Sequence, residues 1–594
     1  MCGLIAAFTE SNTLEAAIRL GMQRMHRRGP DGEGLWQEEG VYLGHRRLAI
    51  LDLDERAAQP MQSASGRYAI VFNGEIYNFR KLRDDLVSQG IEFRTSSDTE
   101  VILAMFEAEG PEMLPKLHGM FAFVIWDRVD KRGFAARDPY GIKPLYVTTT
   151  ADGVMLASQV KSLLATGLVS REGDPIGQAG FWMLGSVPEP HTWYRDVKAM
   201  PSGHYAWIEN GRMAGSVCWF DIGRVWRESS TLQLADDVVR GQVRAAVRES
   251  VARHLVADVP VGVFLSGGID SGVLAALMVE LGAQNVQGVT IAYDEFAGTR
   301  EDEAPVAAAV ALMYGIRHHV RRVTRDEFIA DLPRIIDAMD QPSIDGVNTW
   351  FASKAVAELG LKVVVSGVGG DELFQGYETF EQIPRLVSRW RMLSRIPGIH
   401  ALGQAIGIGQ AIRSRNDRWR HAAEWARTIS GAWWLRRSLN APEDLSVLMG
   451  KESAREGLRG FSPSQWISEM SGALPSDDRL ALSQIDSTTY LRNQLLRDSD
   501  WASMDHGVEL RTPLVDAELL TSLGMLLPSF QRYPGKRLLA DAPDIPLPRE
   551  ISLRRKTGFG IPIGQWLADS LPRVVDIGSR GWAQDLADRY EAMD

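Results

Sequence analysis

The stretch VPVGVFLSGGIDS, residues 259–271, joins an apolar strand to a glycine-rich turn and the start of a helix. Glycines let the backbone approach an anion closely, and the first turn of a helix offers unpaired N–H groups and the positive end of its dipole. Ser266 and Ser271 add hydroxyl donors. The stretch therefore predicts a phosphate-binding loop, although it lacks the Gly-Lys-Ser/Thr ending of a Walker A motif. A purely structural turn is the alternative interpretation.

Apolar strands and helices alternate on both sides of this turn. The expected strands are 259–265, 286–293 and 361–365, and the expected helices are 238–254, 272–281 and 304–314. Such alternation predicts a parallel sheet with helices on both faces. Ligands of these α/β sheets bind beyond the carboxyl ends of the strands, where the glycine-rich turn is expected.

A second glycine-rich turn, SGVGGDELF over residues 366–374, follows the strand 361–365. Asp371 and Glu372 are suited to hold Mg²⁺, which prefers carboxylate, water and phosphate oxygens. Alone, the same string could simply cap a helix. Together with the first turn, it favours the metal-binding side of one nucleotide site.

The first part of the chain, residues 1–210, has a different pattern, with many strands and few helices. This mixed order predicts a layered α+β domain. Residues 211–235 are mostly polar and are interrupted by Gly211 and Gly215, which predicts a linker before an α/β domain over 236–594. The expected strands are 4–8, 41–51, 68–72, 121–126, 133–137, 144–147 and 154–157, and the expected helices are 13–25, 78–88 and 98–109.

The second residue of the chain is a cysteine. If Met1 is removed, Cys2 carries a thiol and a free α-amino group on the same residue. An α-amine titrates near ~8 and a thiol near ~8.5, so a nucleophile and a proton acceptor would lie side by side. The apolar strand that starts at Leu4 leaves no room for a signal sequence.

Composition narrows the class of protein. The net charge of −11 argues against a general nucleic-acid binder. The only cysteines, Cys2 and Cys218, exclude a disulfide framework and a thiolate metal site, and no apolar run is long enough to span a bilayer. A cytoplasmic enzyme is expected, and the sequence leaves open whether it forms a homodimer.

Several short motifs occur in one order along nearly the whole chain, and in that order they resemble the family of glutamine-dependent asparagine synthetases. In the first part they are MCG (1–3), HRRGPD (26–31), GHRRL (44–48), FNGEIYN (72–78), SDTE (97–100) and RDPYGIKPLY (137–146). In the second part they are the two glycine-rich turns, SM (503–504), ELRTP (509–513) and RKTGF (555–559).

The resemblance implies an N-terminal-nucleophile hydrolase domain with a four-layer αββα core. In that family Cys2 would attack the side-chain amide of glutamine, with the Asn73 side chain and the Gly74 N–H as the oxyanion hole. The resemblance also assigns three side chains to glutamine binding: Arg47 to its α-carboxylate, and Glu75 and Asp98 to its α-ammonium. The alternatives are a surface ion pair for Arg47 and a helix N-cap for Asp98.

For the second domain, the resemblance implies an ATP pyrophosphatase that transfers AMP from ATP to a carboxylate. Ammonia released at Cys2 would reach this domain through an internal tunnel and displace AMP from the carboxylate. The implied Mg²⁺ ligands are Asp270 and Asp371, and Lys556 would neutralise phosphate charge, unless it is simply a solvated cation. The implied ATP-binding residues are Leu265, Ser266, Gly267, Gly268, Asp270, Ser271, Ile291, Ser366 and Gly367.

Three positions depart from the family pattern. Val368 replaces a glutamate, Gln159 replaces a glutamate, and Gln375 replaces a glycine. They leave amide ligation intact but weaken the case for aspartate as the acceptor. Aspartate remains the first expectation, and a larger carboxylated acceptor, such as a polysaccharide sugar or a natural-product precursor, is the alternative. The arginine- and tryptophan-rich segment 385–437 could bind an anionic acceptor or could simply form amphipathic helices.

Overall fold

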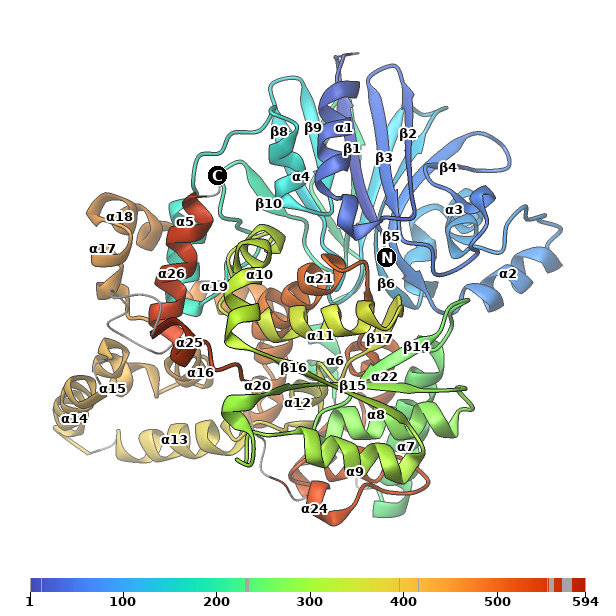
Figure 1. Cartoon of the computed structure of the whole chain (residues 1–594). Helices are drawn as coiled ribbons and strands as arrows, with labels where there is room; N and C mark the ends of the chain where they lie inside the picture. The colour runs from blue at the N-terminus through green and yellow to red at the C-terminus, as the bar shows by residue number, and fades with distance from the viewer. Residues whose placement is uncertain are drawn as a thin grey trace.

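The computed structural model describes residues 2–592 except residues 12, 230–233, 395, 415, 553, 555–559 and 569–578. Figure 1 shows a strand-rich part that contains the N-terminal strands, and a second part in which helices surround a separate sheet. Every described helix is too short or too polar to cross a lipid bilayer.

The strand-rich part contains two antiparallel sheets that face each other. The first has the order β10-β8-β9-β1-β3-β2, formed by Val197–Ala199, Tyr146–Thr150, Gly153–Ala157, Gly3–Thr9, Val41–Arg47 and Gly32–Glu38. The second has the order β12-β11-β7-β6-β5-β4, formed by Arg212–Met213, His204–Glu209, Arg132–Arg137, Gly119–Asp127, Tyr68–Ile76 and Met61–Gln62. Several strands were expected from the sequence, although the strand expected over 41–51 ends at Arg47.

Alternation along β1 explains the layering. Leu4, Ala6 and Phe8 point into the apolar layer between the two sheets, whereas Ile5 and Ala7 lie in the core on the opposite face, where α1 packs. The helices α1 (Glu15–Arg24) and α4 (Val160–Ala165) cover this outer face, and α2 (Phe79–Ser88) and α3 (Asp98–Glu109) accompany the second sheet. The expected four-layer αββα arrangement of an N-terminal-nucleophile hydrolase is confirmed.

The stretch 211–235, expected to be a linker, contains regular structure at its start. Strands β12 and β13 (Val217–Cys218) both pair with β11, so the second sheet extends beyond residue 210. Helix α6 (Ile222–Glu228) follows, with Trp226 almost fully buried. The sequence predicted a linker here because the stretch is rich in glycine and polar residues. The two strands were missed because each has only two residues, too few to show an alternating apolar pattern.

The second part is built on a five-stranded parallel sheet of order β16-β15-β14-β17-β18, which confirms the expected α/β class. Its strands are Arg317–Val323, Gln287–Tyr293, Val261–Phe264, Val363–Val365 and Glu509–Arg511. The sequence did not indicate β16 or β18. The first is a charged strand at the sheet edge, and the second has three residues.

Helices cover both faces of this sheet. Leu274 and Leu277 of α8 (Ile269–Glu280) share a core with Val263 and Val365, whereas Trp350 and Phe351 of α11 lie in the core on the other face. The remaining helices near the sheet are α7 (Asp236–His254), α9 (Ala304–Tyr314), α10 (Arg325–Ala338), α11 (Val347–Glu358), α12 (Gly370–Phe374), α21 (Arg497–Met504), α22 (Ala517–Leu523), α23 (Arg537–Ala540) and α24 (Arg549–Ser552).

A helical region extends the second part away from the sheet. It includes α5 (Pro175–Leu184), α13 (Thr379–Leu393), α14 (Ile399–Ser414), α15 (Ala422–Trp425), α16 (Ile429–Arg437), α17 (Leu445–Leu448), α18 (Lys451–Gly460), α19 (Pro463–Ser471), α20 (Asp478–Asp486), α25 (Ile563–Ala568) and α26 (Ser579–Ala592), and a π-helical stretch (Ser487–Leu496) joins α20 to α21. Trp433 and Trp434 of the arginine- and tryptophan-rich segment are buried here. At least these tryptophans therefore belong to the helical core.

One buried and one partly exposed ion pair join the two parts. Arg28, which follows α1, pairs with Asp500 of α21 at 2.6 Å, and Arg24 pairs with Asp337 of α10 at 2.7 Å. The carboxylate of Asp340 accepts the backbone N–H groups of Val160 and Lys161 at the start of α4. These contacts hold the end of β1 that carries Cys2 against the helices of the second part.

Candidate active sites

Cys2 is buried where β1 begins, between the two parts of the molecule. Its N–H donates to the side-chain oxygen of Asn73 at 3.1 Å, and its carbonyl accepts from Arg28 at 3.2 Å. Burial raises the pKa of the Cys2 thiol, although a hydrogen bond from the Leu48 N–H and the charge of Arg47 act in the opposite direction. Burial therefore disfavours the thiolate form of Cys2.

Asn73 and Gly74 lie in β5, opposite Cys2. The Asn73 side-chain nitrogen donates to the Ser158 hydroxyl at 3.4 Å, and that hydroxyl also accepts the N–H of Leu4 at 3.1 Å. A Cβ on Gly74 would overlap the carbonyl oxygen of Met120 on the neighbouring strand, so only glycine fits. The structure therefore brings Cys2, Asn73 and Gly74 together, as the oxyanion-hole assignment requires.

Asp98 is the first residue of α3, but it is not the N-cap. Ser97 is the cap, because its hydroxyl accepts the N–H of Glu100, whereas Asp98 accepts the N–H of Ile76 at 3.0 Å. Burial raises the pKa of Asp98 to about 6, although hydrogen bonds from the N–H groups of Ile76 and Thr99 act to lower it. The Asp98 side chain therefore contacts the end of β5 and does not cap the helix.

Glu75 lies beside an arginine that belongs to the second part. The guanidinium of Arg511 is 3.6 Å from Glu75 and 2.6 Å from Glu509. Burial, together with the charges of Glu509 and Asp98, raises the pKa of Glu75 well above its ordinary value. Strand β18 thus contributes charge to the pocket beside Cys2, which no motif indicated.

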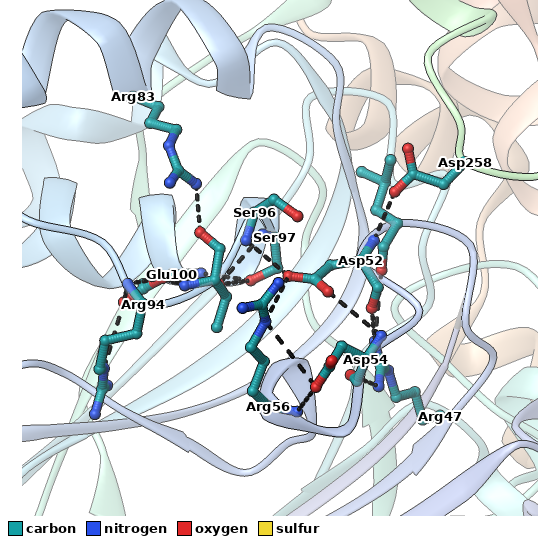
Figure 2. Close-up of polar contacts among 12 residues, drawn as sticks. Arg47, Asp52, Asp54, Arg56, Arg83, Arg94, Ser96, Ser97, Glu100 and Asp258 are labelled. Atoms are coloured by element: carbon teal, nitrogen blue, oxygen red, sulfur yellow. Dashed lines mark hydrogen bonds and ion pairs between the residues drawn. The ribbon is translucent and has the colours of Figure 1, made fainter.

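Arg47 ends β3, and backbone carbonyls of the following loop hold its guanidinium. It donates to the carbonyls of Asp54 at 2.8 Å and of Asp52, and among the residues that the structure describes it makes no surface ion pair of the kind given as the alternative interpretation. Figure 2 shows how the loop is anchored: the Asp52 carboxylate accepts the N–H of Ser96 at 2.7 Å, and the Asp52 N–H donates to Asp258 at 2.8 Å. Asp258 precedes β14, so the second part holds the loop in place.

The first glycine-rich turn lies between β14 and α8, as the sequence predicted. The Ser271 hydroxyl accepts the N–H of Ser266 at 3.1 Å, and the two hydroxyls are 2.9 Å apart. Gly268 is the N-cap residue of α8. The turn therefore presents hydroxyls and helix N–H groups toward one point beyond the strand.

The second glycine-rich turn touches the first. A Cβ on Gly367 would lie 2.7 Å from the Cβ of Asp270, so a side chain there would separate the turns. Asp270 and Asp371 meet at the ammonium of Lys536, with Nζ–O distances of 2.6 Å and 2.7 Å. The two carboxylates raise the pKa of Lys536 although its burial acts in the opposite direction. The two expected metal ligands are therefore brought together around a lysine.

A cavity of about 550 Å³ opens over both turns. Its walls include all the residues expected to bind ATP: Leu265, Ser266, Gly267, Gly268, Asp270, Ser271, Ile291, Ser366 and Gly367. Val368, Asp345 and Asp498 also line it. Burial and the charge of Asp345 raise the pKa of Asp498 to about 7. One nucleotide-sized cavity thus contains the whole predicted set.

Comparison with known proteins agrees with this pair of sites. A family model described as "Glutamine amidotransferase domain" matches residues 1–219, and a model described as "Asparagine synthase" matches residues 242–582. The chain belongs to the asparagine synthase family. The Cys2 site lies within the first match and the nucleotide-sized cavity within the second, so this family member is a glutamine amidotransferase with a synthase domain.

Some relatives of this chain are named asparagine synthetases, and others are named amidases. A "Putative asparagine synthetase [glutamine-hydrolyzing]" of Mycobacterium tuberculosis is 34% identical over 100% of this chain and 93% of its own length. "Asparagine synthetase [glutamine-hydrolyzing] 1" of Bacillus subtilis is 30% identical over 96% of this chain and 88% of its own. "Amidase chry2" of Gibberella zeae is 29% identical over 64% of this chain and 60% of its own.

Sequence reasoning missed two cations at the nucleotide-sized cavity. Lys536 lies in a Gly-Lys pair without a recognised motif, and its left-handed backbone, with φ of 62°, turns it between the two carboxylates. A Cβ on Gly267 would collide with the Arg554 guanidinium, so Arg554 lies directly against the first turn. Lys556, the lysine that the family resemblance indicated, lies outside the described residues.

The three departures from the family pattern lie in different places. Val368 lines the nucleotide-sized cavity, whereas Gln159 lines a small cavity next to Arg28 at the junction of the two parts. Gln375 has a φ of 57°, a left-handed conformation that glycine adopts without strain, which explains why glycine is usual at this position. Val368 is therefore the departure that lines the nucleotide-sized cavity, whereas Gln375 lines a neighbouring cavity.

Proposed function

We propose that the protein is a glutamine-hydrolysing asparagine synthetase, which uses ATP and Mg²⁺ to convert aspartate to asparagine. The observation that carries the proposal is the presence, in one chain, of a buried Cys2 beside Asn73 and of a cavity lined by the two glycine-rich turns. The names of the full-length relatives support aspartate as the acceptor. The same proposal divides the chain into the expected glutaminase domain, whose limits of 1–210 are extended to include strands β12 and β13, and a synthetase domain over 236–594.

At the first site, the sulfur of Cys2 attacks the side-chain carbonyl carbon of glutamine, and its proton passes to the α-amine that Cys2 gains on loss of Met1. The Asn73 amide and the Gly74 N–H stabilise the oxyanion that forms. The C–N bond then breaks, ammonia leaves, and water releases glutamate from the thioester. Arg47 orients the glutamine α-carboxylate, while Asp98 and Glu75 orient its α-ammonium.

At the second site, a carboxylate oxygen of the acceptor attacks the α-phosphorus of ATP, which forms an acyl-adenylate and releases pyrophosphate. The turn at 266–271 binds the leaving phosphates. Asp270 and Asp371 fit Mg²⁺, which commonly binds one or two carboxylates and completes its shell with phosphate and water. When bound, Mg²⁺ supplies positive charge to the departing phosphates. Lys536 neutralises the same two carboxylates while no metal is present.

Ammonia completes the reaction when it attacks the acyl carbon and displaces AMP. In water at neutral pH ammonia is mostly ammonium, which is not nucleophilic, so a closed passage from Cys2 is part of the proposal. The ion pair of Arg28 with Asp500 lies beside this route, because Asp498 and Ser499 of the same helix line the nucleotide-sized cavity.

A larger carboxylated acceptor is the second candidate, and Val368 is the observation that favours it. An aliphatic side chain in the wall of the cavity offers neither a base nor a charge to an amino acid acceptor. The chemistry of both sites stays the same in this alternative, and only the acceptor differs.

One experiment tests both candidates. The protein is incubated with ATP, Mg²⁺ and glutamine, and AMP and glutamate are measured with and without aspartate. Asparagine synthesis predicts AMP and asparagine in equal amounts only when aspartate is present. Glutamate formation without any aspartate-dependent AMP would reject aspartate and leave the larger acceptor. Absence of both products would reject the two-site function.

A further inference from the structure

A second cavity adjoins the nucleotide-sized cavity. Its volume is about 1040 Å³, and Gly376, Tyr377, Gly535 and Arg554 belong to the walls of both. Five arginines line it, and we call it the arginine groove: Arg385, Arg479, Arg537, Arg549 and Arg554. Because Gly376 and Gly535 flank Lys536 and Asp371, the groove opens beside the phosphate end of the nucleotide-sized cavity.

Much of the positive charge in the groove is not neutralised by the protein. Among the described residues, Arg479, Arg537 and Arg549 have no ion-pair partner. Three acidic residues face the five arginines: Glu381 binds Arg385 at 2.9 Å, Asp541 binds Arg240 from outside the groove, and Glu378 accepts a hydrogen bond from Gln382. The lining of the groove therefore has a net positive charge, which favours an anionic ligand.

Arg554 connects the groove to the phosphate-binding turn. One of its terminal nitrogens donates to the carbonyl of Arg300 at 2.7 Å. The other, Nη1, is buried against Gly267 and has no hydrogen-bond acceptor within the described part of the chain. A buried N–H without an acceptor is costly, so a ligand oxygen is expected there.

We propose that the arginine groove binds a diphosphate group. Guanidinium groups bind phosphate oxygens with two parallel hydrogen bonds, and several arginines along one groove suit a ligand with several anionic oxygens. Two sources of the same chemistry exist: the pyrophosphate that the proposed reaction releases next to Arg554, or a diphosphate carried by a larger acceptor. In either case the ligand would lie next to the nucleotide-sized cavity, because the two cavities share lining residues.

Binding of inorganic pyrophosphate, measured by isothermal titration calorimetry, tests the proposal without any turnover. The protein is first saturated with Mg²⁺ and the α,β-methylene analogue of ATP, which occupies the phosphate-binding turn and is not cleaved. The wild-type protein should still bind one pyrophosphate. The double variant Arg479→Gln/Arg537→Gln should bind it about tenfold more weakly or worse, which corresponds to about 1.4 kcal/mol.

The matched control is Arg19→Gln/Arg224→Gln, which removes two exposed arginines that each pair with a glutamate one helical turn away. This control should bind pyrophosphate as the wild type does. Glutamine hydrolysis at Cys2 should be unchanged in both double variants, which shows that they fold. Equal pyrophosphate affinity in the groove variant and the wild type, or no binding beyond the analogue, would overturn the proposal.

Kinetics then separate the two sources. If the reaction's own pyrophosphate occupies the groove, product inhibition by pyrophosphate with aspartate as acceptor should weaken in the groove variant. If the acceptor carries the diphosphate, UDP-glucuronic acid should stimulate AMP formation by the wild type more than by the variant. The source arms rest on the proposed reaction, whereas the calorimetric test requires only that the ATP analogue binds and needs no turnover, so failure of one is distinguishable from failure of the other.

Discussion

The backbone N–H of Ser366 donates to the carbonyl of Arg511 at 2.8 Å, and the guanidinium of the same Arg511 lies 3.6 Å from Glu75. One residue thus contacts both proposed sites, because Ser366 lines the nucleotide-sized cavity and Glu75 lies in the pocket beside Cys2. The parallel pairing of β17 with β18 places Arg511 opposite Val365, one residue before the second glycine-rich turn.

Arg511→Met should damage both sites. The guanidinium is fully buried and is the ion-pair partner of Glu75 and Glu509, so its loss removes a buried positive charge from beside two buried carboxyl groups. Breaking a buried pair in this way typically costs about 3–5 kcal/mol of unfolding free energy. Chemical denaturation measures that loss. Arg253→Met, which removes a partly buried partner of Asp516, is the control and should cost less.

Arg511→Lys keeps the charge but loses the planar fork. We expect this variant to fold and to hydrolyse glutamine, but with more glutamate released per AMP formed than in the wild type. The ratio of glutamate to AMP is the measurement. An unchanged ratio would mean that Arg511 has a purely structural role.

Cys2→Ala should abolish glutamine-dependent synthesis and spare synthesis from added ammonium, because only the first site needs the thiol. Amide product is measured with each nitrogen source. Cys218→Ala is the matched control, since Cys218 is exposed at the end of the second sheet and should be dispensable. Loss of the ammonium-dependent reaction in Cys2→Ala would contradict the separation of the two sites.

The KM for glutamine should rise as the pH falls below about 6. Burial raises the pKa of Asp98 to about 6, so its carboxylate is ionised at pH 7 and becomes neutral below that value. A neutral Asp98 cannot pair with the α-ammonium of glutamine. Glutamate release between pH 5 and 8 gives the profile. In Asp98→Asn the KM should be higher and should lack this change near pH 6; an identical profile would remove Asp98 from the site.

Lys536→Met should lower ATP-dependent AMP formation about 10²-fold or more, the scale at which loss of a preorganised charge affects a transition state. Glutamine hydrolysis should persist. Loss of the lysine removes the cation that lies 2.6 Å from Asp270 and 2.7 Å from Asp371, so the variant should also bind Mn²⁺ more tightly in the absence of nucleotide. Electron paramagnetic resonance of free Mn²⁺ measures this. Weaker Mn²⁺ binding in the variant would refute the exchange of lysine for metal.

Short sequence patterns predicted those features of the structure that are formed by residues close together in the sequence. The glycine-rich turns, the N-terminal cysteine and the helix at Asp98 were predicted because the residues that define each of them are neighbours in sequence. The edge strand Arg317–Val323 was missed because its charged residues hide any strand pattern. Arg511, Lys536 and Arg554 were missed as site residues because only the tertiary fold brings them to the two pockets.

Burial of Cys2 has a further consequence for the lifetime of the enzyme. Oxidants react with the thiolate rather than the thiol, and burial raises the pKa of this thiol while restricting access to it. An idle molecule should therefore resist conversion of its nucleophile to a sulfenic acid, and exposed Cys218 should be alkylated first by a thiol reagent. The burial of Cys2 would then also preserve the enzyme between turnovers.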